Sequence, residues 1–132
     1  MFRILRPPHG RVLLAGVLAV VLAGCVNPAS DRLAELPVLT TVPDGVEVIE
    51  RRSGTEIGGW PSAGPQAQVS YRVVRGDPEE VLEQIREIAL DSGWDLEPDG
   101  SLRGSLETDD GLARFSAFNR STTDEVIVSV WL

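Results

Sequence analysis

The sequence lacks lysine altogether, and it contains one cysteine, Cys25, and one histidine, His9. A single cysteine cannot form an internal disulfide. Because His9 precedes the first apolar run, the chain beyond that run has no histidine that could act as a general base or complete a zinc site. Without lysine there is also no phosphate-binding P-loop. We therefore expect no cofactor, no metal site and no catalysis that depends on histidine, lysine or a cysteine cluster.

Basic residues are scarce beyond Cys25. All 20 aspartates and glutamates follow this residue, but only nine of the 12 arginines do, so that this part of the chain has a net charge of −11. A surface this acidic repels the phosphates of nucleic acids and the headgroups of anionic lipids. We therefore exclude nucleic acid as a partner.

Residues 1–24 have the pattern of an export signal. Three arginines precede an apolar run over residues 12–21, and no acidic residue interrupts either part. The run has about the length of a signal-peptide core and is too short for a comfortable transmembrane span. Positive charge ahead of such a run stays on the cytoplasmic side during insertion. The pattern predicts a segment that is removed after export.

The apolar run ends in Leu22-Ala23-Gly24-Cys25. These four residues resemble the lipobox of bacterial lipoprotein precursors, which reads Leu, a small residue, Gly or Ala, then Cys. The resemblance implies cleavage between Gly24 and Cys25 and acylation of Cys25, so that two or three acyl chains hold the protein in a lipid bilayer. We expect an extracytoplasmic protein on the cell membrane, or on the outer membrane if the organism has one. The alternative is an ordinary export signal, or an uncleaved anchor, with an accidental cysteine.

Residues 25–44 are interpreted as a lipidated N-terminus and tether, and residues 45–132 as one small domain. The tether is rich in proline, which keeps a chain extended. An alternative is a strap that packs on the domain through Leu33, Leu36 and Leu39. The remaining chain is also similar in pattern to small lipoproteins of high-GC Gram-positive bacteria, with a tether, a Gly-rich loop, a capped helix and a strand meander. That similarity implies no known activity.

The domain is predicted to be an α+β two-layer sandwich, with one amphipathic helix on a mainly antiparallel sheet and the order β-β-α-β-β-β. Asp77-Pro78-Glu79-Glu80 has the features of a capped helix start, and Gly93 those of a helix end. Apolar residues between them recur on one helical face. Period-two alternation and turn residues predict strands at 46–51, 68–74, 94–97, 102–108, 112–119 and 125–132.

A long loop rich in glycine and proline is predicted over residues 52–66, and it contains Ile57 and Trp60. Loops of this length are uncommon within compact domains and are often functional. Trp60, with Ile57, is either a contact for a partner or part of a lid folded back on the sheet edge.

The first functional hypothesis is a non-enzymatic interaction or binding module in the cell envelope, with an unknown envelope protein or small ligand as its partner. A second is a small-ligand protein whose cavity lies between helix and sheet, lined by Tyr71, Ile85 and Phe115. A third is a hydrolase of envelope glycans, which needs two carboxylates across a cleft. The candidates for that pair are Glu47, Glu50, Asp95, Glu97 and Glu107.

Overall fold

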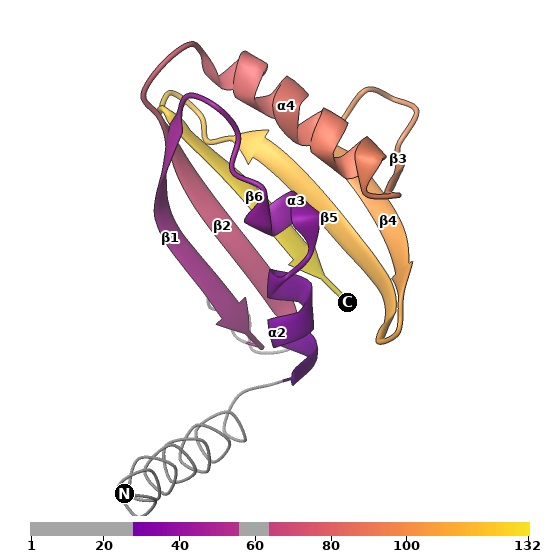
Figure 1. The fold of residues 1–132 in the computed structure, drawn as a ribbon. Helices are drawn as coiled ribbons and strands as arrows, with labels where there is room; N and C mark the ends of the chain where they lie inside the picture. Colours follow the sequence, from indigo (N-terminus) through magenta and orange to yellow (C-terminus); the bar gives the residue numbers. More distant parts are fainter. Residues whose placement is uncertain (1–27, 56–63) are drawn as a thin grey trace, which may run out of the picture.

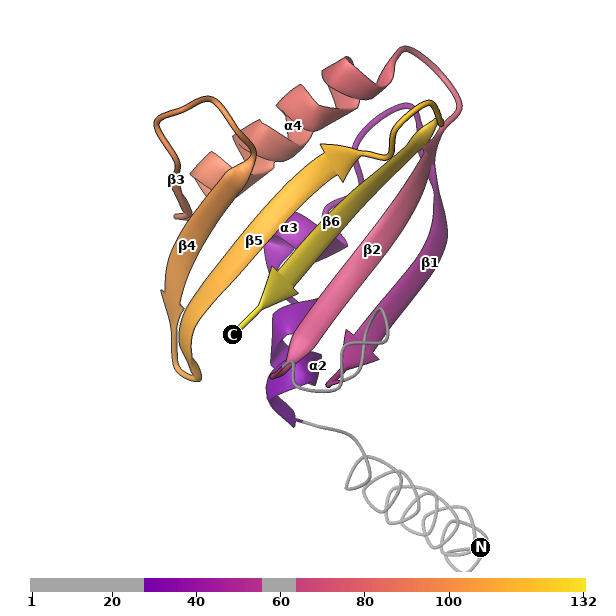
Figure 2. The same ribbon diagram turned by 180° about the vertical axis from the view of Figure 1, so that it is seen from behind.

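The computed structural model describes residues 28–55 and 64–132. Six strands form one antiparallel sheet in the spatial order β1-β2-β6-β5-β4-β3. Helices α2 (Pro28–Ala34), α3 (Pro37–Thr40) and α4 (Pro78–Asp91) lie on one face of this sheet (Figure 1), and Figure 2 shows the opposite face without a helix over it. The strands are β1 (Val46–Gly54), β2 (Gln66–Val73), β3 (Asp95–Leu96), β4 (Arg103–Thr108), β5 (Gly111–Asn119) and β6 (Glu125–Trp131).

The hydrophobic core lies between the sheet and the three helices. Strand β6 alternates between fully buried and half-buried residues, and its valines at 126, 128 and 130 are all 0% exposed. On β5 the same alternation directs Ala113, Phe115 and Ala117 into the core. The predicted α+β class is therefore confirmed, and both strands show the period-two alternation that the sequence predicts.

Helix α4 begins where its capping residues predict. The Asp77 side chain accepts a hydrogen bond from the Glu80 backbone N–H, 3.0 Å between heavy atoms, and such a cap stabilises a helix by about 1 kcal/mol. Gly93 follows the helix with a φ of 91°, a conformation that glycine adopts without strain. The side chains that α4 buries are those of Val81, Ile85 and Ala89.

The predicted order β-β-α-β-β-β is wrong in two respects. Four strands follow α4, in agreement with the four ranges predicted individually beyond the helix, whereas the predicted order has only three. Two helices, α2 and α3, precede β1. Helices of seven and four residues gain little from local propensity, so that tertiary packing decides whether they form.

Residues 28–40 form a strap that packs on the sheet, which is the alternative to a free tether. Leu33 and Leu39 are 1% and 2% exposed and belong to the core cluster. The Ser30 hydroxyl donates to the Gly54 carbonyl oxygen over 2.9 Å, at the end of β1. Arg51 on β1 donates to the Leu39 carbonyl oxygen over 2.6 Å. The folded unit therefore begins no later than Pro28.

The loop predicted over residues 52–66 is shorter than expected. Strand β1 continues to Gly54, and β2 already begins at Gln66. The extension escaped prediction because β1 is an edge strand whose side chains are mostly exposed, and because its register shifts between Val48 and Glu50. Within the described ranges, every helix is too short or too polar to cross a membrane.

Candidate functional site

The sheet face opposite the helices is a patterned surface. Residues directly opposite each other in neighbouring antiparallel strands lie on the same face, so that the register defines rows across the sheet. The first row runs through Gly54, Gln66, Trp131, Arg114, Ser105 and Asp95, from β1 to β3. The second row, from β1 to β4, runs through Arg52, Gln68, Ser129, Ser116 and Arg103.

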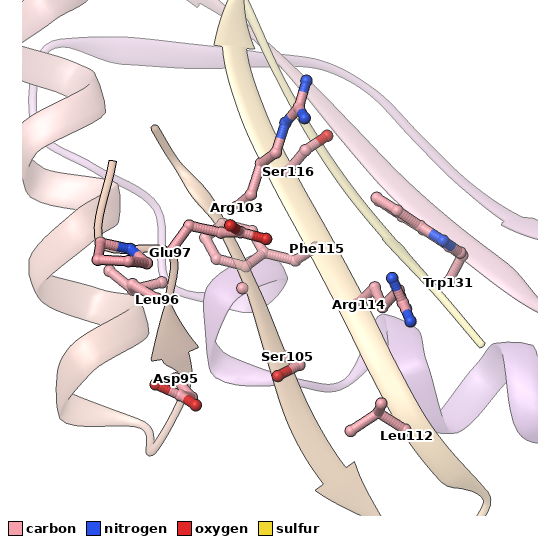
Figure 3. Close-up of a pocket in the computed structure, with 12 residues that line it drawn as sticks. Asp95, Leu96, Glu97, Arg103, Ser105, Leu112, Arg114, Phe115, Ser116 and Trp131 are labelled. Carbon is pink, nitrogen blue, oxygen red and sulfur yellow. The ribbon is translucent and has the colours of Figure 1, made fainter. Parts of the chain in front are cut away.

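A hollow of about 600 Å³ lies on this face over β3, β4, β5 and the end of β6. We refer to it as the open-face groove, and Figure 3 shows the side chains that line it. Its polar and aromatic lining comes from Asp95, Glu97, Arg103, Ser105, Arg114, Ser116 and Trp131.

Two exposed arginines lie within the groove as diagonal neighbours. Arg103 on β4 is opposite Ser116, two residues along β5 from Arg114, and the Cα atoms of such diagonal neighbours are about 7–8 Å apart. In the described part of the chain, neither guanidinium forms an ion pair or a hydrogen bond. Figure 3 shows the Arg103 side chain directed away from Asp95 and towards Ser116. Both guanidinium groups are therefore available to a ligand.

The other arginines of the open face contrast with this pair. Arg72 on β2 contacts the Glu47 carboxylate at 2.7 Å, and Arg52 on β1 contacts Glu50 at 3.4 Å. Acidic side chains thus form ion pairs with Arg72 and Arg52, whereas among the described residues the two arginines of the groove form none.

Trp131 lies directly opposite Arg114, on the β6 side of the groove. It is half-buried, and an aromatic ring on the solvent-facing side of a sheet offers a large flat contact surface. The serines at 105, 116 and 129 occupy neighbouring positions, and their short side chains leave space between the longer ones. Among the described residues, these three hydroxyls have no hydrogen-bond partner.

Gly104 allows β3 to pack closely beside the groove. A Cβ atom at this position would lie 2.8 Å from the Asp95 carbonyl oxygen and 2.9 Å from Leu96 Cδ2, so that any side chain would displace β3. Beneath it, the rings of Trp94 and Phe115 pack at a centroid distance of 5.0 Å. The close approach of β3 holds Asp95, and Glu97 just beyond it, at one rim of the groove.

A second hollow of about 690 Å³ adjoins the groove between α4 and β5, and it shares Arg103 and Ser116 with it. Its lining includes Leu82 and Phe118, which is 47% exposed, together with the charged residues Glu79, Glu83 and Arg86.

Comparison of this chain with protein-family models, with curated proteins and with solved structures found no match.

The site residues expected from sequence are placed only in part. Gly24, Cys25, Ile57 and Trp60 lie outside the described residues. The residues expected to line an inner cavity, Tyr71, Ile85 and Phe115, are at most 1% exposed and belong to the hydrophobic cluster between sheet and helices. Burial raises the pKa of the Tyr71 hydroxyl, and the nearby Arg51 guanidinium opposes this shift. This part of the structure thus offers no support for an inner ligand cavity.

The candidate carboxylates lie towards both edges of the sheet, with Glu47 and Glu50 on β1, Asp95 on β3 and Glu107 on β4. Glu47 lies on β1 and Asp95 on β3, which are opposite edges of a sheet of six strands. Five strand spacings separate these edges, about 24 Å, whereas the two carboxylates of a glycosidase lie roughly 5–9.5 Å apart. Asp95 and Glu97 lie together at the β3 rim of the groove.

Sequence reasoning did not identify Arg103, Arg114 and Trp131 as a site. The alternation of β5 and β6 already placed Arg114 and Trp131 on the side away from the core. Their proximity was not apparent, because it depends on the pairing of β5 with both β4 and β6. A solvent-facing tryptophan beside an arginine in an acidic chain was the signal that could have revealed the site.

An ion pair connects the strap to the turn between β4 and β5, two strands that line the groove. Arg32 Nε donates to Asp110 Oδ2 over 2.7 Å, and this contact lowers the pKa of the Asp110 carboxyl below its ordinary value of 3.8. A lowered folded-state pKa contributes stability that is present above the ordinary value and is lost as pH falls through the folded-state value. Asp110→Asn should therefore destabilise the protein at pH 7 and make little difference at pH 2. Urea unfolding at a series of pH values measures this.

Asp124→Asn is the matched control, because Asp124 is exposed and its side chain has no ion pair among the described residues. A difference between Asp110→Asn and the unsubstituted protein that persists undiminished at pH 2 would contradict the ion-pair explanation.

Proposed function

We propose that this chain is a membrane-anchored lipoprotein that acts outside the cytoplasm as a non-enzymatic binding module of the cell envelope. In this proposal the acylated Cys25 holds the protein in the bilayer, and the open-face groove is the surface that binds an envelope component. The observation that carries the proposal is a pair of arginines that form no ion pair with a described residue, beside a half-buried tryptophan on a sheet face that no described helix covers.

The composition of the groove favours binding. Tryptophan and arginine are the residue types most enriched among those that dominate binding energy in protein interfaces. Twenty acidic residues follow Cys25 in this chain, yet none of those described forms an ion pair with Arg103 or Arg114. A binding role gives these residues a partner that the fold itself does not supply.

The groove favours binding over turnover. Its ionisable residues are two arginines and two carboxylates, and both carboxylates lie on the same rim. Hydrolysis of a glycan requires a carboxylate on each side of the scissile bond. The guanidinium groups of Arg103 and Arg114 offer hydrogen-bond donors and no acceptor, so that they are suited to holding a ligand.

The short link to the proposed anchor limits where the groove can lie. Only Val26 and Asn27 separate Cys25 from the start of α2, and three fully extended residues span at most about 10 Å. Acylated Cys25 would thus keep α2 close to the bilayer surface. The Ser30–Gly54 hydrogen bond places the first row of the open face at that same end of the sheet.

Photocrosslinking in living cells tests this proposal. A benzophenone amino acid at position 116 places the reactive group on the groove floor, and the same group at position 87, on the exposed side of α4, is the control. We expect a discrete adduct with an envelope component from position 116, its loss in Arg114→Gln, and no such adduct from position 87. Equal labelling from both positions, or none from position 116, would count against the groove as a binding surface.

A further inference from the structure

We infer that the ligand of the open-face groove is a saccharide that carries carboxylate groups, an inference that rests on the proposed function of the groove. The structure points to this class through the charge of Arg103 and Arg114, the ring of Trp131, the serine floor and the position of the two carboxylates.

The two guanidinium groups of Arg103 and Arg114 are suited to bind an anionic hydrogen-bond acceptor. Like charges on diagonal cross-strand neighbours repel each other, and among the described residues neither guanidinium forms an ion pair, although Asp99 lies within electrostatic range of Arg103. Each guanidinium presents five N–H donors in a fixed plane, and a carboxylate can accept two of them from one guanidinium at the same time. A ligand carboxylate above the pair would satisfy these donors and remove the repulsion.

The floor and the β6 side of the groove suit a sugar ring better than a peptide. The indole of Trp131 offers a flat apolar face to the C–H groups of a ring, while the hydroxyls of Ser105 and Ser116 can exchange hydrogen bonds with sugar hydroxyls. An extended peptide is usually bound by adding a strand at a sheet edge. The groove instead crosses β4, β5 and β6, whose backbone groups already pair with one another, so that a peptide backbone would find few partners.

The rim carboxylates select against a dense polyanion. Asp95 and Glu97 lie within the same groove as the arginines. They would repel a phosphate polymer, but each can accept hydrogen bonds from the hydroxyls of a saccharide. Arginines at the centre and carboxylates at one rim thus match a hydroxyl-rich chain with spaced carboxylates.

Calorimetric titration of the acylated full-length mature chain, held in detergent micelles, tests this inference. The probe is a short hyaluronate oligomer, a linear saccharide with a carboxylate on every second ring, and its methyl ester is the uncharged analogue. We expect the oligomer to bind and the ester to bind at least about tenfold more weakly, the effect of losing one charge-assisted contact. Arg114→Gln and Trp131→Ala should each weaken binding about tenfold.

Arg75→Gln is the matched control. Arg75 is exposed in the turn between β2 and α4, its side chain has no partner among the described residues, and its replacement removes the same charge outside the groove. Its affinity should stay within about twofold of the unsubstituted protein. Arg114 is likewise exposed, so that unchanged thermal unfolding of Arg114→Gln separates a lost contact from a damaged fold.

Three results would overturn the inference. Polyglutamate or polyphosphate that binds as tightly as the oligomer would show that the groove recognises charge alone. If Arg75→Gln weakened binding as much as Arg114→Gln, binding would depend on the charge of the whole surface and not on the groove. Absence of oligomer binding, with crosslinking from position 116 intact, would reject the saccharide and leave the proposed binding function standing. Absence of both would reject the two together.

Discussion

Replacing Cys25 with alanine is expected to release the protein from the membrane completely. The resemblance of residues 22–25 to a lipobox implies a thioether-linked diacylglycerol on this cysteine, and each buried methylene of an acyl chain contributes about 0.8 kcal/mol to membrane binding. Two or three chains make the anchor stable, and none of the described helices can span a bilayer in their place. Detergent phase partition and incorporation of a labelled fatty acid measure the change.

Val26→Ala is the control for this experiment, because it alters the neighbouring residue and keeps the cysteine. It should retain both the label and the partition into detergent. An unsubstituted protein that is membrane-bound at the mass of the full precursor and carries no label would instead support the alternative of an uncleaved apolar anchor. A Cys25→Ala protein that is shortened and soluble does not by itself support an ordinary export signal. That alternative also requires that the unsubstituted protein takes up no labelled fatty acid.

Phe115→Ala should be the most destabilising single core substitution in β5. Its ring is 1% exposed, packs against Trp94 at 5.0 Å and lies 3.3 Å from the position that a Cβ atom of Gly104 would occupy. Removing it leaves a cavity between sheet and α4, which for phenylalanine costs about 3–5 kcal/mol. Urea unfolding should show this loss as a lower midpoint with an unchanged dependence on urea concentration.

Phe118→Ala provides a control on the same strand. Phe118 is 47% exposed on the opposite face, so that its replacement should change the free energy of unfolding by roughly 0.5 kcal/mol or less. Equal losses for the two substitutions would mean that β5 does not direct alternate residues to opposite sides in solution. Phe115→Ala should also weaken ligand binding, because its ring supports β4 and β3 beneath the groove.

The parts of the fold that could be predicted are those whose signal is local. Asp77 and Gly93 marked the bounds of α4 because capping and a positive φ depend on a few neighbouring residues. The alternation of β6 identified its buried face because a strand directs successive side chains to opposite sides. The strap, by contrast, was left undecided, since its leucines could pack only on a surface that the rest of the chain creates.

The candidate site was the least predictable part. Arg103, Arg114 and Trp131 are separated by up to 28 positions in sequence, and they share one groove because β5 pairs with β4 on one side and β6 on the other. No short motif contains them. The same strand order places Glu47 and Asp95, two of the candidate catalytic carboxylates, at opposite edges of the sheet.

The sequence by itself determined the export signal pattern, the absence of histidine and lysine chemistry beyond Cys25, the α+β class and the main helix, because each depends on composition or on residues close together in the chain. Only the tertiary structure decided that residues 28–40 pack as a strap, that the sheet has six strands in the order β1-β2-β6-β5-β4-β3, and that two arginines and a tryptophan meet on its open face. These features depend on which distant strands pair and in which register. Contacts throughout the whole core together stabilise this pairing over the alternatives.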